Sequence, residues 1–285
     1  ARVLALDVVA ELFKLAIGGE PLGLYSADSP RQLVSGFDPF PEQRNDVSYG
    51  RDLFGQLRYF ATPTPGAANG ASSIIGVVEP VHVNVSRGHF TTPFALTASC
   101  PTPGATLRYT TDGSEPTVSS TVFPTSLQIS TTTLFRIAAF KTGYLPSKTA
   151  THTYFFNLPE NLRSLPAISI VTASNNLYGP NGILGINGGY YDSGQGGLWI
   201  STSTNDYHNP SKHGLAWERE TSVEWIQPED NSGFQAECGI RVQGSDYQRP
   251  RLSPSSKYSF RLYFRSDYGD GRLNYPAFPL TGVER

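Results

Sequence analysis

Glycine and proline interrupt this chain at short intervals, and that punctuation most restricts what it can fold into. The 285 residues include 28 glycines and 22 prolines, while charged residues make up only 16%. Apolar runs between the breaks are short, as in "LGLYS", "LVSGF" and "LFRIAAF". Short apolar runs bounded by turn residues are typical of β-strands. The sequence therefore predicts a mainly β protein.

The length and the charge limit the class of protein further. A chain of 285 residues is long enough for two or three domains, each with its own core. The net charge of -2 gives no reason to expect a nucleic acid or an anionic membrane as partner. No stretch approaches the roughly 20 apolar residues of a membrane span. We therefore expect no transmembrane segment in these residues.

The opening residues lead us to expect a piece of a longer protein. Methionine is absent, and the opening "ARVLALDVVAELFKL" has neither a basic start nor a long apolar run. Cys100 and Cys238 fall in different predicted segments, so a disulfide between them is not expected.

Two loop-rich stretches divide the chain into three segments. Residues 61–73, "ATPTPGAANGASS", and residues 157–166, "NLPENLRSLP", lack an apolar period and carry the composition of linkers. The predicted organisation is a β domain, a linker, a β-sandwich, a second linker and a final domain, at residues 1–70, 71–76, 77–156, 157–164 and 165–285.

The first segment resembles the C-terminal half of a lamin-tail domain, an immunoglobulin-like β fold found in bacterial surface proteins. The blocks that carry the resemblance are "FKL", "GGEPLGLYSADS", "LVSGFDPFPEQRNDVSYGR" and "YFATPTPGAANG". It implies that the N-terminal strands of that domain are missing. Asp46 and Arg51 belong to the family pattern, and we interpret them as structural because polar turn residues usually satisfy local backbone groups.

The second segment contains "PGATLRYTTDGSEPT", which resembles the C-terminal β-sandwich module of chitobiase and hexosaminidase-type enzymes. In those enzymes the module is an appendage, so the resemblance does not imply sugar hydrolysis. The segment has no close pair of carboxylates of the kind that glycoside hydrolysis needs. Asp112 and Glu115 share one turn, and we interpret them as turn formers beside Gly113, which accepts a positive φ.

The third segment contains a strand, a turn and a second strand in residues 239–265, "GIRVQGSDYQRPRLSPSSKYSFRLYFR". The second strand alternates with period two. Its predicted apolar face consists of Tyr258, Phe260, Leu262 and Phe264. The other face carries three cations: Lys257, Arg261 and Arg265. A solvated strand face is the favoured interpretation from spacing alone, whereas a phosphate group would pair more strongly with such a row than surface carboxylates do.

Four blocks of this segment together resemble the N-terminal part of the spore-coat CotH kinase family. They are "LPAISIVT" with "NNLYGPNGI", "WERETSVEWIQPE", "GFQAECGIRVQGS" and "SPSSKYSFRLYFRSDYGDGRLNYPAFP". The resemblance implies the β-rich part of an α+β kinase-like domain that binds ATP and magnesium and phosphorylates protein Ser or Thr.

The same resemblance implies roles for individual residues. Lys257 takes the place of the nucleotide-phosphate ligand, Arg261 supports it, and Gly244 and Ser245 lie in the turn that covers the phosphates. Metal-binding and catalytic acidic residues would follow later, beyond Arg285, so these residues alone are not expected to transfer phosphate. We interpret the acidic "DYGDG", with Asp267 and Asp270, as a connecting turn.

Other candidate sites are weaker. His208 and His213 are separated by Pro210 within a stretch that does not suit a helix, so a zinc site is not favoured. Tyr190, Tyr191 and Trp199 could stack on sugar rings, although aromatic residues in glycine-rich loops more often anchor the loop.

The sequence thus predicts a secreted or cell-surface multidomain protein. The leading hypothesis is a kinase part with ATP and magnesium as cofactors and a protein substrate. The alternative is a non-enzymatic adhesion or carbohydrate-associating protein that uses its immunoglobulin-like β modules as binding or spacer units.

Overall fold

The computed structural model describes residues 18–44, 46–72, 74–269 and 271–276. It confirms a mainly β protein, with 39% strand and 8% helix. Two compact units divide the chain, Ala1–Gly76 and Val77–Arg285. The opening residues, including the block "FKL", and Asp270 lie outside the described residues.

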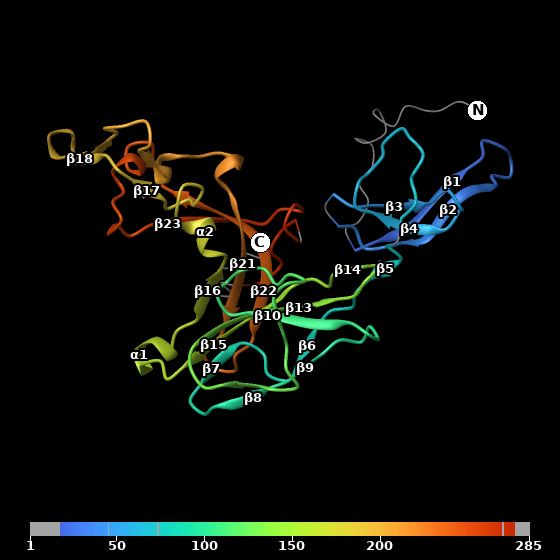
Figure 1. Ribbon diagram of the computed structural model, residues 1–285, viewed down its shortest axis with the longest axis horizontal. Helices are drawn as coiled ribbons and strands as arrows, with labels where there is room; N and C mark the ends of the chain where they lie inside the picture. Colours follow the sequence, from blue (N-terminus) through green and yellow to red (C-terminus); the bar gives the residue numbers. More distant parts are fainter. Residues whose placement is uncertain (1–17, 45, 73, 270, 277–285) are drawn as a thin grey trace. The chain divides into compact units, whose positions relative to one another are not determined.

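The first unit contains two antiparallel pairs of strands, β1 (Glu20–Tyr25) with β2 (Leu33–Phe40) and β3 (Ser48–Arg51) with β4 (Leu57–Phe60) (Figure 1). An aromatic cluster forms its core, in which the rings of Tyr49 and Tyr59 lie 4.7 Å apart. Asp46 adopts a positive φ of 55°, and Arg51 donates a hydrogen bond to the Gly55 carbonyl at 2.9 Å. Both residues therefore shape local backbone.

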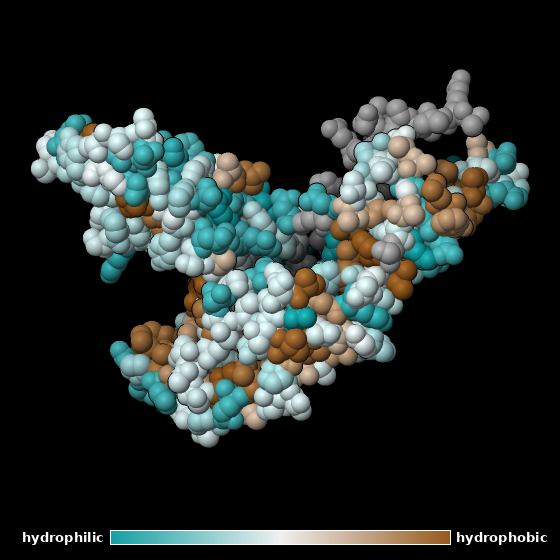
Figure 2. Space-filling model, in the orientation of Figure 1, coloured by the Kyte–Doolittle hydropathy of each residue, from teal (hydrophilic) through white to brown (hydrophobic). Residues whose placement is uncertain are grey.

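The outer surface of β1 and β2 is apolar. Figure 2 shows this apolar surface over the two strands, and the exposed side chains there are Leu24, Tyr25, Leu33 and Val34.

The second unit begins with a β-sandwich-like module. Its largest sheet has five strands in the order β11-β10-β13-β15-β7, with β7 parallel to β15. These strands are β7 (Gly88–Phe90), β10 (Thr106–Thr110), β11 (Thr121–Val122), β13 (Thr133–Phe140) and β15 (Ala150–Phe156). The shorter strands are β5 (Gly76–Val77), β6 (His82–Val83), β8 (Phe94–Leu96), β9 (Ala98–Ser99), β12 (Leu127–Ile129) and β14 (Tyr144–Leu145).

Period-two alternation builds the core of this module. Phe135 and Ile137 on β13 pack with Leu96 and Tyr154 and are completely buried. The Tyr154 hydroxyl donates a hydrogen bond to the Val85 carbonyl at 2.8 Å, which satisfies the one polar atom of that buried ring. Arg136, between Phe135 and Ile137, points to the opposite face and is also buried, because a second sheet covers that face.

The covering sheet has four antiparallel strands in the order β16-β21-β22-β23. They are β16 (Ala167–Val171), β21 (Arg219–Ile226), β22 (Gly233–Gln243) and β23 (Ser259–Tyr263). The helix α1 (Glu160–Arg163) precedes the sheet, and β15 contacts β21 (Figure 1).

A long excursion between β16 and β21 closes one end of this sheet. It contains α2 (Ser174–Leu177), β17 (Ile186–Asn187), β18 (Tyr190–Asp192), β19 (Leu198–Ile200) and β20 (Tyr207–His208). Ile183 from the excursion packs with Ile240 and Val242 of β22 in a second core. None of the described helices is long and apolar enough to cross a membrane.

Candidate functional site

The β22–β23 hairpin places its charged side chains on one face of the four-stranded sheet. Arg241 pairs with Arg261, and Gly239 pairs with Tyr263. Paired residues of an antiparallel ladder point to the same side, so these side chains share a face. On the other face Tyr258 and Leu262 pack against Ile240, as the alternation predicts. Phe260 departs from the prediction, because 38% of it is exposed.

The turn after β22 is fastened by arginine side chains to backbone carbonyls. Arg249 donates to the carbonyls of Gly244 and Lys212, at 2.9 and 3.0 Å. Arg251 donates to the carbonyls of Gly196 and Gln195. The two arginines therefore hold the turn against the neighbouring backbone.

Gly244 and Ser245 begin this turn. The exposed Ser245 accepts a hydrogen bond from the Gln248 amide at its hydroxyl, at 3.1 Å. Lys257 lies two residues before Ser259, the partner of Gln243 and the first residue of β23. The hairpin thus brings Gly244, Ser245 and Lys257 to the same end of the β22–β23 ladder.

Only part of the predicted cation row is free. Lys257 and Arg261 are exposed and make no ion pair with any residue that the structure describes. Arg265 instead lies with its Nε 3.1 Å from Oε1 of Glu218. Of the three predicted cations, Arg265 therefore already has an acidic partner, which is distant from it in sequence.

Glu218 is a buried anchor beneath this face. Its carboxylate lies 2.6 Å from Nε of Arg241, and its side chain is completely buried. A Cβ at Gly239 would lie 2.5 Å from Oε1 of Glu218, so only glycine leaves room for the carboxylate. The ring of Tyr263 lies between Arg241 and Arg265, at 4.3 and 5.0 Å.

Burial and a hydrogen bond to Glu218 raise the pKa of Tyr268 to about 12, which keeps that phenol neutral.

A cavity of about 480 Å³ lies beside β23. Its lining residues are Leu262, Tyr263, Phe264, Arg265, Gly271, Arg272 and Leu273. Its volume is within the usual range of small-ligand pockets.

Two of the candidates in the long excursion, His208 and Trp199, have structural contacts, whereas His213 and Tyr190 are exposed. His208 is buried, with Nε2 2.8 Å from the Leu252 carbonyl. The Trp199 ring covers Gly189, where a Cβ would lie 2.5 Å from the indole, and its Nε1 donates to the Gly188 carbonyl at 3.2 Å. These contacts support the anchoring interpretation over a sugar platform.

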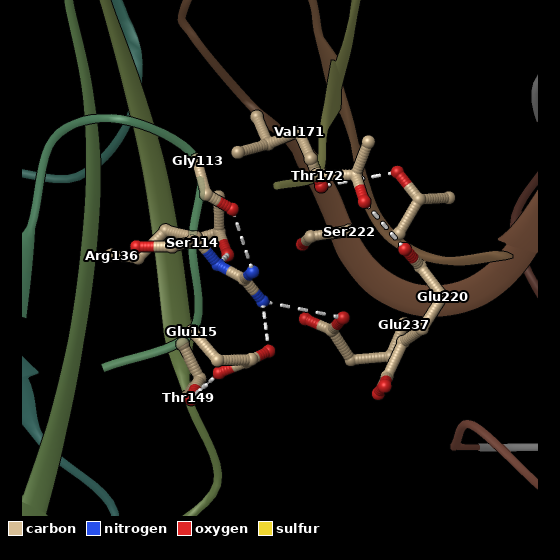
Figure 3. Close-up of polar contacts among 12 residues, drawn as sticks. Gly113, Ser114, Glu115, Arg136, Thr149, Val171, Thr172, Glu220, Ser222 and Glu237 are labelled. Atoms are coloured by element: carbon tan, nitrogen blue, oxygen red, sulfur yellow. Dashed lines mark hydrogen bonds and ion pairs between the residues drawn. The ribbon is translucent and has the colours of Figure 1, made fainter. Parts of the chain in front are cut away.

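A second polar cluster, absent from the sequence predictions, lies between the β-sandwich-like module and the four-stranded sheet (Figure 3). Arg136 on β13 is only 3% exposed and forms an ion pair with Glu115. Its NH1 donates to the Gly113 carbonyl at 3.1 Å, and its NH2 lies 3.6 Å from Oε2 of Glu237. Carboxylate oxygens of Glu115, Glu220 and Glu237 lie within 4.8 Å of one another. We call Arg136, Glu115, Glu220 and Glu237 the Arg136 cluster.

The electrostatics of the Arg136 cluster favour a neutral carboxyl group. Burial is the main cause that raises the pKa of Glu237 to about 7; Arg136 opposes it and the negative charge of Glu115 adds to it. Burial and the charge of Glu115 also raise the pKa of Glu220. Three carboxylates in this arrangement could hold a cation, and the Arg136 guanidinium already lies between two of them.

A separate ion pair crosses the same interface. Arg87 Nε lies 2.7 Å from Oε1 of Glu224, whose side chain is completely buried. Thr153 donates its hydroxyl proton to Glu224, so Ser169 must donate to Thr153 across their 2.7 Å contact. At the β21–β22 turn, Asn231 accepts a hydrogen bond from the His89 amide at 2.9 Å.

The predicted turn residues have divided roles. Asp112 forms the turn, since it accepts a hydrogen bond from the Ser114 amide at 3.0 Å. Glu115 pairs with Arg136 instead. Gly113 has a φ of +83°, and a Cβ there would lie 2.5 Å from the Thr172 carbonyl oxygen. The turn therefore docks directly onto the residue that follows β16.

Comparison with known proteins identifies the family of one segment, the β-sandwich-like module. Residues 85–151 match the family of the chitobiase/beta-hexosaminidase C-terminal domain. The chain therefore contains a β module of this type, which we call the chitobiase-type module. Among curated proteins and among solved structures, none matches this chain.

Proposed function

We propose that this chain is part of an extracellular or cell-surface protein, and that its four-stranded sheet belongs to a CotH-like kinase domain. The β22–β23 hairpin would bind the phosphates of ATP, and the complete domain would phosphorylate Ser or Thr of a protein substrate. Lys257 is the proposed phosphate ligand and Arg261 its neighbour on the same strand, beside the turn that starts at Gly244 and Ser245.

The observation that carries this proposal is the difference between two pairs of cations. Glu218 forms ion pairs with both Arg241 and Arg265, whereas Lys257 and Arg261 are exposed without an acidic partner among the described residues. Unpaired cations beside one another repel, and a polyphosphate would relieve that repulsion with charge-assisted hydrogen bonds. The hairpin therefore suits an anion better than a cation.

The residues present fit the phosphates but not the magnesium ion. Magnesium would neutralise the phosphate charge, and kinases hold it with separate acidic and amide residues. Among the described residues the acidic cluster with metal-binding spacing is Glu115, Glu220 and Glu237, which Arg136 occupies. We therefore assign phosphate binding to this hairpin and no transfer step.

Replacing Lys257 with alanine should weaken Mg-ATP binding. A charge-assisted hydrogen bond contributes about 1.5–3 kcal/mol, so affinity should fall about tenfold to a hundredfold in isothermal titration calorimetry. Lys257→Arg should retain most of the affinity because it keeps the charge. Arg31→Ala removes an exposed cation in the first unit and serves as the control. Equal affinities for Lys257→Ala and Arg31→Ala would exclude Lys257 from the site.

We further propose that the first unit is the C-terminal half of a lamin-tail-like domain. Its two antiparallel strand pairs around an aromatic core support this assignment, together with the sequence blocks quoted above. Such domains occur in surface proteins, which agrees with the proposed location.

A second candidate function is carbohydrate association at the cell surface, favoured by the matched chitobiase-type module. If this function is correct, the chain should be retained on chitin or on soluble chitooligosaccharide columns in the absence of ATP. Elution in the void volume, from columns that retain a known chitin-binding protein, would count against it.

A further inference from the structure

The chitobiase-type module and the four-stranded sheet meet through charged side chains. Arg87 and Arg136 come from the module, and Glu224 and Glu237 come from the sheet. Each side thus supplies the counter-charge for the other. Buried ion pairs of this kind depend on the charge state of both partners.

The charges of this interface do not balance. Arg87 and Glu224 form a one-to-one pair, but in the Arg136 cluster three carboxylates share one guanidinium. Oε2 of Glu237 is buried and makes no hydrogen bond among the described residues. With every carboxylate ionised, the Arg136 cluster carries a net charge of about -2, and the excess acts on the partly buried Glu237, where like charges repel more strongly than in water.

We propose that this interface is proton-sensitive, and that it holds the chitobiase-type module and the four-stranded sheet together more tightly in mildly acid solution than above neutrality. Glu237 is the group that takes up the proton. A neutral Glu237 removes one of the two excess negative charges while Glu115 keeps its ion pair with Arg136.

The groups that face Glu237 from neighbouring elements support this choice. Arg136 faces it from β13, Glu115 from the turn between β10 and β11, and Glu220 from β21. Gln235 on β22 donates to its Oε1 at 2.8 Å. From β15, neutral threonines face the sheet, Thr151 to Arg136 and Thr153 to Glu224. Glu218 lies near the same strand, but it forms ion pairs with Arg241 and Arg265.

The sign of the effect follows from the raised pKa. The Glu237 carboxyl binds its proton up to about pH 7 in the folded chain and only up to about 4.5 when unfolded. Between these values the folded state holds more protons, so stability falls as the pH rises. His89, His152 and His208 have lowered pKa values because they are buried, and they act in the opposite direction.

A comparison of variants separates Glu237 from the histidines, because all variants contain the same histidines. From pH 6 to pH 8.5, the melting temperature of the native chain should fall about 2–5 °C more than that of Glu237→Gln. Glu229→Gln removes an exposed carboxylate on the β21–β22 turn and should follow the native chain. Equal pH slopes for Glu237→Gln, Glu229→Gln and the native chain would overturn the proposal.

A second variant, Glu115→Gln, tests the same proposal if the Glu237→Gln chain fails to fold. Glu115→Gln lowers the negative charge near Glu237 and should also flatten the pH slope, since Glu237 then ionises at lower pH. Hydrogen exchange of residues 111–116, corrected for intrinsic rates, should be faster at pH 8.5 than at pH 6 in the native chain only. Exchange that responds to pH equally in the native chain and Glu115→Gln would contradict the proposal.

Discussion

Replacing Arg136 with methionine is expected to lower the free energy of unfolding of the second unit by about 3–5 kcal/mol, the usual cost of removing one partner of a buried ion pair. Methionine fills a similar volume but leaves Glu115 and Glu237 facing one another without a cation. It also removes the hydrogen bond to the Gly113 carbonyl. Urea unfolding monitored by tryptophan fluorescence would measure the change.

The control for this prediction is another arginine of the same sheet. Arg108 on β10 donates to the Ser120 carbonyl at 2.6 Å and has no ion pair with a described residue. Arg108→Met should cost only about 0.5–1.5 kcal/mol, the value of one hydrogen bond. Adding Glu237→Gln to Arg136→Met should recover part of the loss. Similar losses of unfolding free energy for Arg136→Met and Arg108→Met would show that the ion pairs of the Arg136 cluster add nothing to the stability.

Gly113→Ala is expected to cost about 2–5 kcal/mol, the second largest effect. The left-handed φ of +83° accounts for about 1–2 kcal/mol in a residue with a side chain. The contact of the new Cβ with the Thr172 carbonyl adds about 1–3 kcal/mol, because backbone atoms must move apart.

Gly104→Ala supplies a matched comparison for Gly113→Ala. Gly104 has a φ of +75°, and nothing lies within 4 Å of a Cβ built there. This substitution should therefore show the backbone cost alone. The difference between the two variants, from the same urea titrations, measures how closely the turn docks on the sheet. Equal losses would mean that the contact with Thr172 contributes nothing.

Local features of the fold followed from local sequence. The period-two strand at 257–265 and the preceding strand formed an antiparallel hairpin because their apolar residues repeat with the pleat. Asp112 and Gly113 formed the predicted turn because Gly113, which lacks a side chain, accepts a positive φ and the Asp112 carboxylate accepts the Ser114 amide. Such features depend on neighbours within a few residues.

Contacts between distant residues could not be predicted in the same way. Nothing near Arg265 in the sequence shows that Glu218 neutralises it. Likewise, Arg136 lies far from Glu237, and their contact depends on how two sheets meet. A weak signal existed, because Arg136 in "LFRIAAF" and Glu224 in "VEWI" are single charges within short apolar runs. A charge at such a position needs a partner when it is buried.

The shared ion pairs also affect how such a chain can be rearranged over generations. A chitobiase-type module transplanted by recombination at residues 157–166 would leave with Arg87 and Arg136 but without Glu224 and Glu237. The recipient would gain Arg87 without its counter-charge, while Arg136 would keep only its ion pair with Glu115, and the donor would keep Glu224 and Glu237 without their arginines. The two parts should therefore be inherited as a pair, with charge changes on one side accompanied by compensating changes on the other.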